Sequence, residues 1–212
     1  MILTYYCIIT MIIIAYLLGS IPSAVWIGKK YYGIDIREHG SKNAGTTNML
    51  RVLGRRAALP VFLLDFLKGF VAVTLTEILK YDAYINDMWL INIKIIAVFA
   101  AVLGHIFPIF AGFRGGKGVA TGVGILAAFH PLLALGAVLI WIAVAVTTKI
   151  SSLAAIVASF FAPFLAYWLL GGGVYFGTTV VIALLLIQRH KKNILDLLAG
   201  TESSIGNKPP MP

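Results

Sequence analysis

The chain has 212 residues, of which 60% are hydrophobic and only 12% charged, yet Lys and Arg outnumber Asp and Glu by 17 to 8. A soluble domain averages about 25% charged residues, and a nucleic-acid-binding protein with this much positive charge is normally far more polar, so both classes are disfavoured. The composition indicates an integral membrane protein. Because Cys7 is the single cysteine and no Cys/His cluster has zinc-ligand spacing, we expect neither an internal disulfide nor a metal site.

Seven apolar segments are the candidate membrane helices, since a span needs about 20 mainly apolar residues. They cover Ile2–Trp26, Leu59–Leu79, Trp89–Phe110, Val119–Phe129, Pro131–Thr148, Ser151–Leu170 and Val174–Gln188. The fourth segment is only about half a membrane-length and ends at His130-Pro131, where a helix should break. It is either a short span or a re-entrant helix.

Charge decides between these two topologies, because Lys and Arg near span ends collect on the cytoplasmic side. With seven spans every basic connection falls on one side, whereas six spans place either the Lys149 turn or the basic C-terminus wrongly. We therefore predict an all-α integral membrane protein with seven transmembrane helices, the fourth short, an outside N-terminus and a cytoplasmic C-terminus. Residues 1–198 form a single domain and residues 199–212 a frayed cytoplasmic tail.

The long connection from Gly28 to Arg56 contains a turn rich in Gly, Ser and Asn. Thr46 or Thr47 as N-cap and Gly54 as C-cap predict a helix of about two turns after it. Such a turn aims several backbone N–H groups at one point and forms an anion site, to which Arg51 adds a bidentate phosphate contact. The candidate phosphate-binding residues here are Ser41, Asn43, Gly45, Thr46, Thr47, Asn48 and Arg51.

A second glycine-rich turn opens the short fourth helix. It is not a P-loop, because Gly118 stands where Ser or Thr should follow the lysine. Its candidate residues are Arg114, Gly115, Gly116, Lys117 and Gly118. A third basic cluster, which includes Arg189, His190 and Asn193, ends the last span, so three clusters converge on the cytoplasmic face.

Several of these residues have a simpler interpretation. Most Lys and Arg residues at cytoplasmic helix ends only determine topology, but topology does not require the polar string around Ser41 or the glycines around Lys117. Asp65 and Lys68 lie three residues apart inside a span, and they are either site residues or an ion pair that neutralises itself. His105 is likewise a satisfied helix-end histidine or a site residue.

The motifs together resemble the acyl-phosphate-dependent glycerol-3-phosphate acyltransferase family of bacterial inner membranes. The matching segments, in family order, are Gly19–Ser23, Gly40–Arg51, Asp65–Gly69, Gly104–Pro108, Gly115–Thr121, and Arg189 and His190 with Asn193. Two positions depart from the family pattern: Lys42 stands where the family usually has glycine, and Thr46 where it has alanine. Lys42 restricts the conformation of its turn.

The resemblance implies a seven-span enzyme in the bacterial cytoplasmic membrane with its active site facing the cytoplasm. Members transfer a fatty acyl group from acyl phosphate to the sn-1 hydroxyl of glycerol 3-phosphate, which yields lysophosphatidic acid and phosphate. The expected partners are therefore acyl phosphate, glycerol 3-phosphate and membrane lipid, with no nucleic acid and no cofactor. Oligomeric state does not follow from the sequence.

Direct acyl transfer is the mechanism we expect. The turn from Ser41 to Thr47, together with Arg51, would hold one phosphate. Lys117 and the backbone amides of Gly115 and Gly116 would hold the other. Positive charge near the reacting carbonyl would also stabilise the developing oxyanion. His190 is either the general base or, with Asn193, a residue that orients the acceptor while a substrate phosphate takes the proton; the resemblance favours the second. A covalent acyl-Ser41 intermediate is the third choice.

Arg51 and Lys117, then Arg114 and Arg189, are the cations expected to matter most, and the others are expected to tolerate substitution.

A competing class is a small membrane transporter for an anionic solute. It would need polar residues along the full membrane depth, but the outer halves of the spans are nearly all apolar. The soluble-type glycerolipid acyltransferases would show a His-x4-Asp motif. None of the four histidines has an Asp five residues later.

Overall fold

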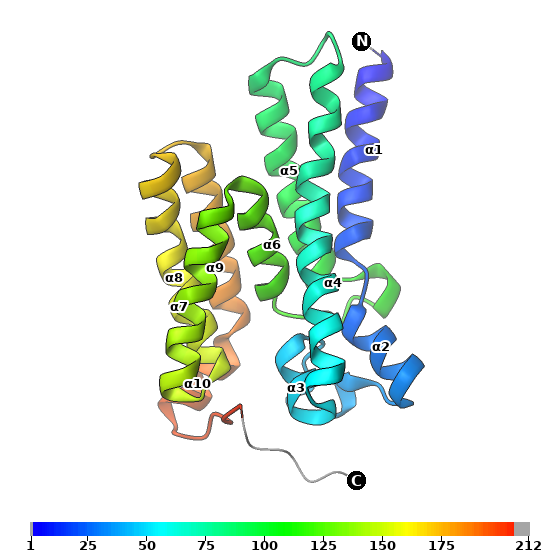
Figure 1. Cartoon of the computed structure of the whole chain (residues 1–212). Helices are drawn as coiled ribbons and strands as arrows, with labels where there is room; N and C mark the ends of the chain where they lie inside the picture. The colour runs from blue at the N-terminus through cyan, green and yellow to red at the C-terminus, as the bar shows by residue number, and fades with distance from the viewer. Residues whose placement is uncertain (1, 206–212) are drawn as a thin grey trace.

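The computed structural model describes residues 2–205, and all regular structure within that range is helical (Figure 1). The helices are α1 (Ile2–Gly19), α2 (Ser23–Tyr32), α3 (Thr46–Leu53), α4 (Arg55–Thr74), α5 (Asp87–Ile106), α6 (Val119–Phe129), α7 (Pro131–Thr148), α8 (Ser151–Leu170), α9 (Val174–Arg189) and α10 (Lys191–Leu198). Three 3-10 turns, η1 (Ile36–Glu38), η2 (Leu75–Tyr81) and η3 (Ile109–Ala111), connect them. Among the described residues, α1, α4, α5, α7 and α8 are long and apolar enough to cross a membrane, and α6 and α9 are shorter apolar helices.

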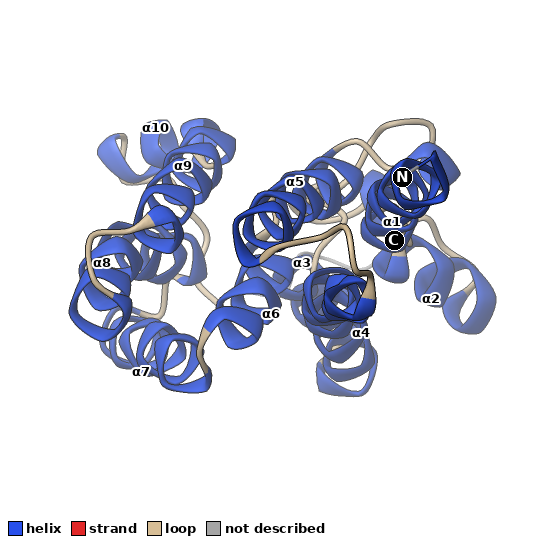
Figure 2. Cartoon of the chain, turned by 90° about the horizontal axis from the view of Figure 1, so that it is seen from above, coloured by secondary structure: helices blue, strands red, loops and turns tan. Residues whose placement is uncertain are grey.

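The long helices form two groups with α6 between them (Figures 1 and 2). In one group α1 packs on α5 and α4 packs on α6, and in the other α8 packs on both α7 and α9. The short helices α2, α3 and α10 gather at one end of the bundle, while the N-terminal end of α1 lies at the opposite end (Figure 1). All three predicted basic clusters therefore lie at the same end.

Close backbone approach fixes α6 against α4. A Cβ atom at Gly69 would lie 2.3 Å from the Thr121 carbonyl oxygen, and one at Gly124 would lie 2.0 Å from that of Phe66. Small residues at such crossings let helix backbones approach in a membrane protein, where packing replaces the hydrophobic effect as the driving force. The glycines therefore place the N-terminus of α6, and the turn before it, at a fixed depth.

The first predicted span is broken in the structure. The sequence predicts one helix over Ile2–Trp26, but α1 ends at Gly19 and α2 begins at Ser23. Pro22 explains the break, because its ring disfavours helical geometry in the preceding residue and it has no N–H to donate. The chain then turns, so that α2 lies at the loop end of the bundle (Figure 1).

Asp65 and Lys68 join this break to α4. Lys68 Nζ lies 2.7 Å from Asp65 Oδ1 and also donates to the Ile21 carbonyl oxygen at 2.8 Å, and the Ser23 hydroxyl donates to Asp65 at 2.5 Å. His105 Nδ1 lies 3.8 Å from the same carboxylate. Asp65 and Lys68 thus neutralise each other, and Lys68 also supplies a donor to a carbonyl oxygen that has lost its helical partner at the break. These contacts favour the interpretation of the two residues as a structural ion pair rather than as site residues.

Residues 199–205 are not frayed, contrary to the expectation for the tail. The Ile205 N–H donates to the Lys149 carbonyl oxygen at 2.7 Å, and the Ser203 carbonyl oxygen accepts from Arg51 at 2.7 Å. The Glu202 side chain is only 5% exposed. The chain after α10 therefore folds back onto the loop end of the bundle, and the remaining tail residues, 206–212, lie outside the described residues.

Candidate functional site

One amide side chain holds the first glycine-rich turn, residues 39–45, in shape. Asn48 of α3 is buried, and its Oδ1 accepts the Ser41 N–H at 2.9 Å. Its Nδ2 donates at 3.0–3.1 Å to the carbonyl oxygens of Ile36, His39 and Asn43. The sequence predicts Asn48 as a phosphate ligand, but an amide with these bonds has no remaining donor for a substrate. Asn48 instead fixes the turn.

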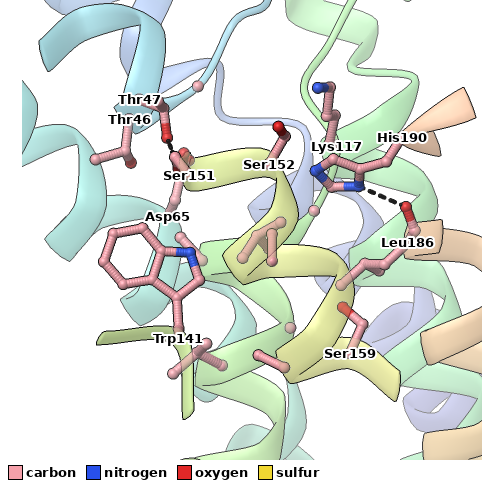
Figure 3. Close-up of a pocket in the computed structure, with 18 of the residues that line it drawn as sticks. Thr46, Thr47, Asp65, Lys117, Trp141, Ser151, Ser152, Ser159, Leu186 and His190 are labelled. Carbon is pink, nitrogen blue, oxygen red and sulfur yellow. Dashed lines mark hydrogen bonds between the residues drawn. The ribbon is translucent and has the colours of Figure 1, made fainter. Parts of the chain in front are cut away.

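The first turn leads directly into α3. Gly45 is the N-cap, rather than the predicted Thr46 or Thr47, and Gly54 is the C-cap as predicted. Thr46 and Thr47 are therefore the first helical residues, where backbone N–H groups have no acceptor inside the helix. The Thr47 hydroxyl lies 2.9 Å from that of Ser151 (Figure 3), and the buried Thr46 hydroxyl has no hydrogen-bond partner within residues 2–205.

The second glycine-rich turn, residues 112–118, is built differently. The Gly115 and Gly116 N–H groups donate to the Ile106 and His105 carbonyl oxygens at 3.2 and 3.1 Å. A Cβ atom at Gly115 would lie 2.0 Å from the His105 carbonyl oxygen, so close backbone approach requires the glycine. The expectation that these two amides hold a phosphate is not met in this structure, because they close the end of α5 instead.

Two cavities meet between the turns. The buried cavity, of about 340 Å³, extends among α6, α7, α8 and α9, and the basic cavity, of about 720 Å³, lies among the loops and α10. The residues that line both are Ser41, Asn43, Arg51, Lys117, Asn193 and Glu202. This shared zone is where a ligand in one cavity would touch a ligand in the other.

The two cavities differ in chemistry. Away from the shared zone, the walls of the buried cavity are mainly apolar or small, and include Phe62, Val123, Leu126, Val138, Trp141, Ala155, Ala158, Ala162, Ile182 and Leu186. The basic cavity is lined by additional cations, namely Arg37, Arg114, Lys42, Arg189 and Lys192. One cavity therefore suits an apolar chain and the other a small anion.

Arg51 is buried at the boundary of the two cavities. Arg51 is 8% exposed. Its Nη2 donates to the Ser203 carbonyl oxygen and lies 4.0 Å from Glu202 Oε1. Its buried Nε–H has no partner within the described residues. Burial lowers the pKa of the guanidinium below its ordinary value, although a guanidinium stays charged. An anion that accepts from Nε would complete its hydrogen bonding.

Lys117 and Asn193 form the other side of the boundary. Lys117 Nζ donates to Asn193 Oδ1, and Asn193 Nδ2 donates to Glu202 Oε1 at 2.9 Å. Burial, opposed by the charge of Glu202 and assisted by that of Arg51, lowers the pKa of Lys117 to about 8. The ammonium is therefore mostly protonated at neutral pH and remains available to a phosphate.

His190 is oriented by its own helix. The ring is 3% exposed, and its Nδ1 lies 2.7 Å from the Leu186 carbonyl oxygen (Figure 3). A carbonyl can only accept, so Nδ1 carries the proton and Nε2 is an unprotonated acceptor. Burial, followed by the charge of Lys117, lowers the pKa of His190 to about 4. The imidazole is neutral at physiological pH.

The structure brings together the five predicted catalytic residues. Four of them, Ser41, Arg51, Lys117 and Asn193, line both cavities, and His190 lines the buried cavity. Of the predicted binding residues, Gly45, Thr46, Thr47, Asn48 and Gly118 line the buried cavity, Arg114, Gly115 and Arg189 line the basic cavity, and Asn43 lines both. Gly116 lines neither. Asp65 and His105 line the buried cavity, whereas Lys68 reaches away to Ile21.

Sequence reasoning missed three polar residues of the site, of which Glu202 lines both cavities and Ser151 and Ser152 line the buried one. Ser151 and Ser152 begin α8, and the Ser152 hydroxyl donates to Glu202 Oε1 at 2.7 Å. The two serines begin an apolar segment, as hydroxyl residues at helix starts commonly do, so their position alone signals only a helix end. Glu202 lies in an irregular stretch after α10 with no pattern around it, and only the tertiary fold places it here.

Fold and site together define a helical membrane protein with a cluster of cations where an apolar cavity meets a basic one. The profile described as Glycerol-3-phosphate acyltransferase matches residues 9–200. The glycerol-3-phosphate acyltransferase of Laribacter hongkongensis is 48% identical to the chain, over 94% of the chain and 97% of that protein. The glycerol-3-phosphate acyltransferase of Fusobacterium nucleatum is 39% identical, over 95% of the chain and 98% of that protein. The chain belongs to the glycerol-3-phosphate acyltransferase family.

A solved structure supports the same conclusion for the fold. The crystal structure of PlsY (YgiH), an integral membrane glycerol 3-phosphate acyltransferase, in its glycerol 3-phosphate form superposes with a TM-score of 0.81 at 38% identity, over 94% of this chain and 96% of that one. Its lysophosphatidic acid form gives a TM-score of 0.79. The resemblance drawn from the motifs is confirmed, and the chain is an acyltransferase rather than a transporter.

Proposed function

We propose that the protein transfers a fatty acyl group from acyl phosphate to the sn-1 hydroxyl of glycerol 3-phosphate, giving lysophosphatidic acid and inorganic phosphate. The observation that carries this proposal is the junction of an apolar cavity with a basic one at Arg51, Lys117 and Asn193. The donor has a long apolar chain and a phosphate, whereas the acceptor is a small polar anion. Each cavity matches one substrate, and both open on the same cations.

The buried cavity has the dimensions of an acyl site. Its lining runs from Ser151 to Ala162 along α8 and from His190 to Thr179 along α9, and each stretch corresponds to about 16 Å of helix. Burying each methylene of an acyl chain contributes roughly 0.8 kcal/mol, so walls of this kind bind a chain without any polar contact. The carbonyl would then lie beside the polar residues at the loop end.

The cavity linings support the proposal that each glycine-rich turn serves a different substrate. Gly45 ends the first turn, and Thr46 and Thr47 begin α3. All three line only the buried cavity, which suits the phosphate of the acyl donor at the N-terminus of α3. Arg114 and Gly115 of the second turn line only the basic cavity, which suits glycerol 3-phosphate. Lys117 lies between the two and would contact both.

The chemistry that follows is direct attack on the acyl carbonyl. The acceptor hydroxyl forms the new ester bond as the bond between the carbonyl carbon and the phosphate oxygen breaks. Lys117 and Arg51 stabilise charge on the tetrahedral oxygen and on the departing phosphate, an interaction that strengthens in the transition state. Fixing both substrates at one junction lowers the entropic part of the barrier.

The hydroxyl proton goes most readily to a substrate phosphate. A neutral His190 with a pKa of about 4 is a weak base at pH 7, whereas a phosphate dianion has a second pKa near 6. The Nε2 acceptor of His190 can instead receive a hydrogen bond from the glycerol hydroxyl and orient it, with Asn193 alongside.

We also propose seven crossings, with α6 as the short fourth span, the N-terminus outside and the C-terminus in the cytoplasm. The opposite positions of the α1 N-terminus and α10 in the bundle agree with an odd number of spans (Figure 1). The basic loops at the α10 end agree with a cytoplasmic site in a bacterial inner membrane.

Purified protein in detergent, supplied with glycerol 3-phosphate and either a long-chain acyl phosphate or the matching acyl-CoA, tests this function. We expect lysophosphatidic acid only with acyl phosphate, and only the sn-1 isomer when the product is separated by chromatography. Product from acyl-CoA alone, or no product from either donor, would contradict the proposal. Mass spectrometry that trapped an acyl group on Ser41 would replace direct transfer with a covalent route.

A further inference from the structure

Arg37 makes a set of contacts that a residue concerned only with topology would not need. It lies in η1, just before the first turn, and its side chain is only 14% exposed. Nε and Nη2 pair with the two carboxylate oxygens of Asp35 at 2.9 and 2.7 Å. Nη1 donates to the carbonyl oxygens of Ala111 and Arg114 at 2.7 and 3.4 Å. The side chain therefore ties η1 to a loop more than 70 residues away in sequence.

The two carbonyl groups that Arg37 holds lie on either side of a strained bend. Gly112 and Phe113 both have left-handed backbones, with φ of 61° and 59°. A left-handed conformation costs a non-glycine residue such as Phe113 roughly 1–2 kcal/mol, so it persists only where surrounding contacts impose it. Arg37 supplies such contacts at Ala111 and Arg114. The segment leads directly to Gly115 and Lys117.

Arg37 is nearly saturated as a donor. A guanidinium has five N–H groups, and the contacts to Asp35, Ala111 and Arg114 use four of them. Hydrogen bonding to Arg37 lowers the pKa of Asp35 well below its ordinary value, so the pair stays ionised throughout the working pH range. Although Arg37 borders the basic cavity, its geometry suits holding the protein rather than holding a ligand.

The first turn does not depend on Arg37 in the same way. Asn48 fixes that turn through four hydrogen bonds of its own. The second turn has no such internal amide among the described residues: it rests on the end of α5 and on Arg37. Loss of Arg37 should therefore affect the two turns unequally.

We infer that Arg37 is a positioning residue for the glycerol 3-phosphate site: it holds the second glycine-rich turn so that Arg114 and Lys117 face the acceptor phosphate. This inference rests on the proposed function and its assignment of the second turn to the acceptor. It replaces the sequence-based expectation that cations other than Arg51, Lys117, Arg114 and Arg189 tolerate substitution.

Steady-state kinetics of Arg37→Ala with both substrates varied tests the inference. We expect KM for glycerol 3-phosphate to rise about tenfold, the effect of losing roughly 1.4 kcal/mol from a charged hydrogen bond, while KM for acyl phosphate changes less than twofold. Arg37→Lys should restore little, because an ammonium cannot pair with both Asp35 oxygens and reach Ala111 as well. Arg55→Ala, which removes the same charge from an exposed cytoplasmic position, is the matched control.

A second variant keeps the test informative if Arg37→Ala folds poorly. Asp35→Asn leaves the arginine in place but loosens it, and should raise the same KM by a smaller factor. The double variant with Asp35→Asn and Arg37→Ala should have the same KM for glycerol 3-phosphate as Arg37→Ala alone, because both changes disrupt the same Arg37–Asp35 interaction. Four results would overturn the inference. Two are seen in Arg37→Ala itself: equal rises in both KM values, or a fall in kcat with both KM values unchanged. The others are additive effects of Asp35→Asn and Arg37→Ala on KM, and kinetics of Arg37→Ala like those of Arg55→Ala. An inactive wild type would refute the proposed reaction instead, so the two failures are distinguishable.

Discussion

The two glycine-rich turns look alike in sequence but are held by opposite means. In the first, a side chain of the following helix, Asn48, satisfies the loop from within. In the second, the backbone itself docks against the end of α5, and a distant arginine secures the bend. In the first turn, a glycine with an extended backbone can be replaced by another residue. In the second turn, glycine is required where a Cβ atom would clash with the backbone of α5.

Substituting glycines in the two turns should give the largest contrast. Gly115→Ala would place a Cβ atom 2.0 Å from the His105 carbonyl oxygen, so the turn must move by about an ångström, and kcat/KM should fall about a hundredfold. Gly45 has an extended backbone with φ of −147°, and its nearest obstacle is the flexible Asn43 amide, so Gly45→Ala should cost less than tenfold. Equal losses in the two variants would contradict the comparison.

Removing the internal amide should affect the donor side. Asn48→Ala leaves three backbone carbonyls without their donor, and an unsatisfied buried polar group costs about 1–3 kcal/mol. We expect KM for acyl phosphate to rise about tenfold, with a smaller change for glycerol 3-phosphate, measured by initial rates. Asn92→Ala, at an exposed position of α5, is the control. A selective effect on the acceptor KM would reverse the assignment of the turns.

The pH dependence should report the protonation of Lys117, which lines both cavities. Because burial lowers its pKa to about 8 and the protonated form binds phosphate, kcat/KM should fall tenfold per unit above that pH. A separate acid limb is expected below about pH 6, where the substrate phosphate takes up a proton itself. Lys117→Arg keeps its charge at all accessible pH values, so the alkaline fall should vanish even if the activity is lower. An unchanged alkaline limb in that variant would exclude Lys117 as its origin.

The smallest effect is expected at Lys42, which has a left-handed backbone with φ of 58° at a position where the family usually has glycine. Lys42→Gly relieves about 1 kcal/mol of strain but gives the unfolded chain up to about 1 kcal/mol of extra entropy. We therefore expect thermal stability in detergent to rise by less than about 1 kcal/mol, with kinetics unchanged. A clear fall in the melting temperature would show that the lysine side chain contributes to the turn.

The sequence predicts much of this molecule because apolar length and charge placement are local signals. The bounds of α6, α7 and α8 match the predicted segments, and the motifs indicate all five candidate catalytic residues. The break before Ser23 was missed because the apolar composition continues across Pro22. Local signals cannot distinguish amides that face a ligand from amides that face α5, which is why Gly115 and Gly116 were misassigned.

Tertiary contacts account for the rest. Glu202, Ser151 and Arg37 reach the site through hydrogen bonds to residues 50, 104 and 74 positions away in sequence, and none belongs to a recognisable sequence pattern. Asn48 is polar, lies in the expected string and is buried, yet it supports the turn. Only its hydrogen-bond partners separate that role from substrate binding.

The return of the chain after α10 has a consequence for biosynthesis. Arg51 precedes α4, whereas Glu202 and Ser203 follow α10, so the contacts among them join the segment before α4 to the segment after α10. Domains are generally built from the N-terminus during synthesis. These contacts therefore form only after all the helices have been synthesised, so a chain that is truncated before α10 has an incomplete site.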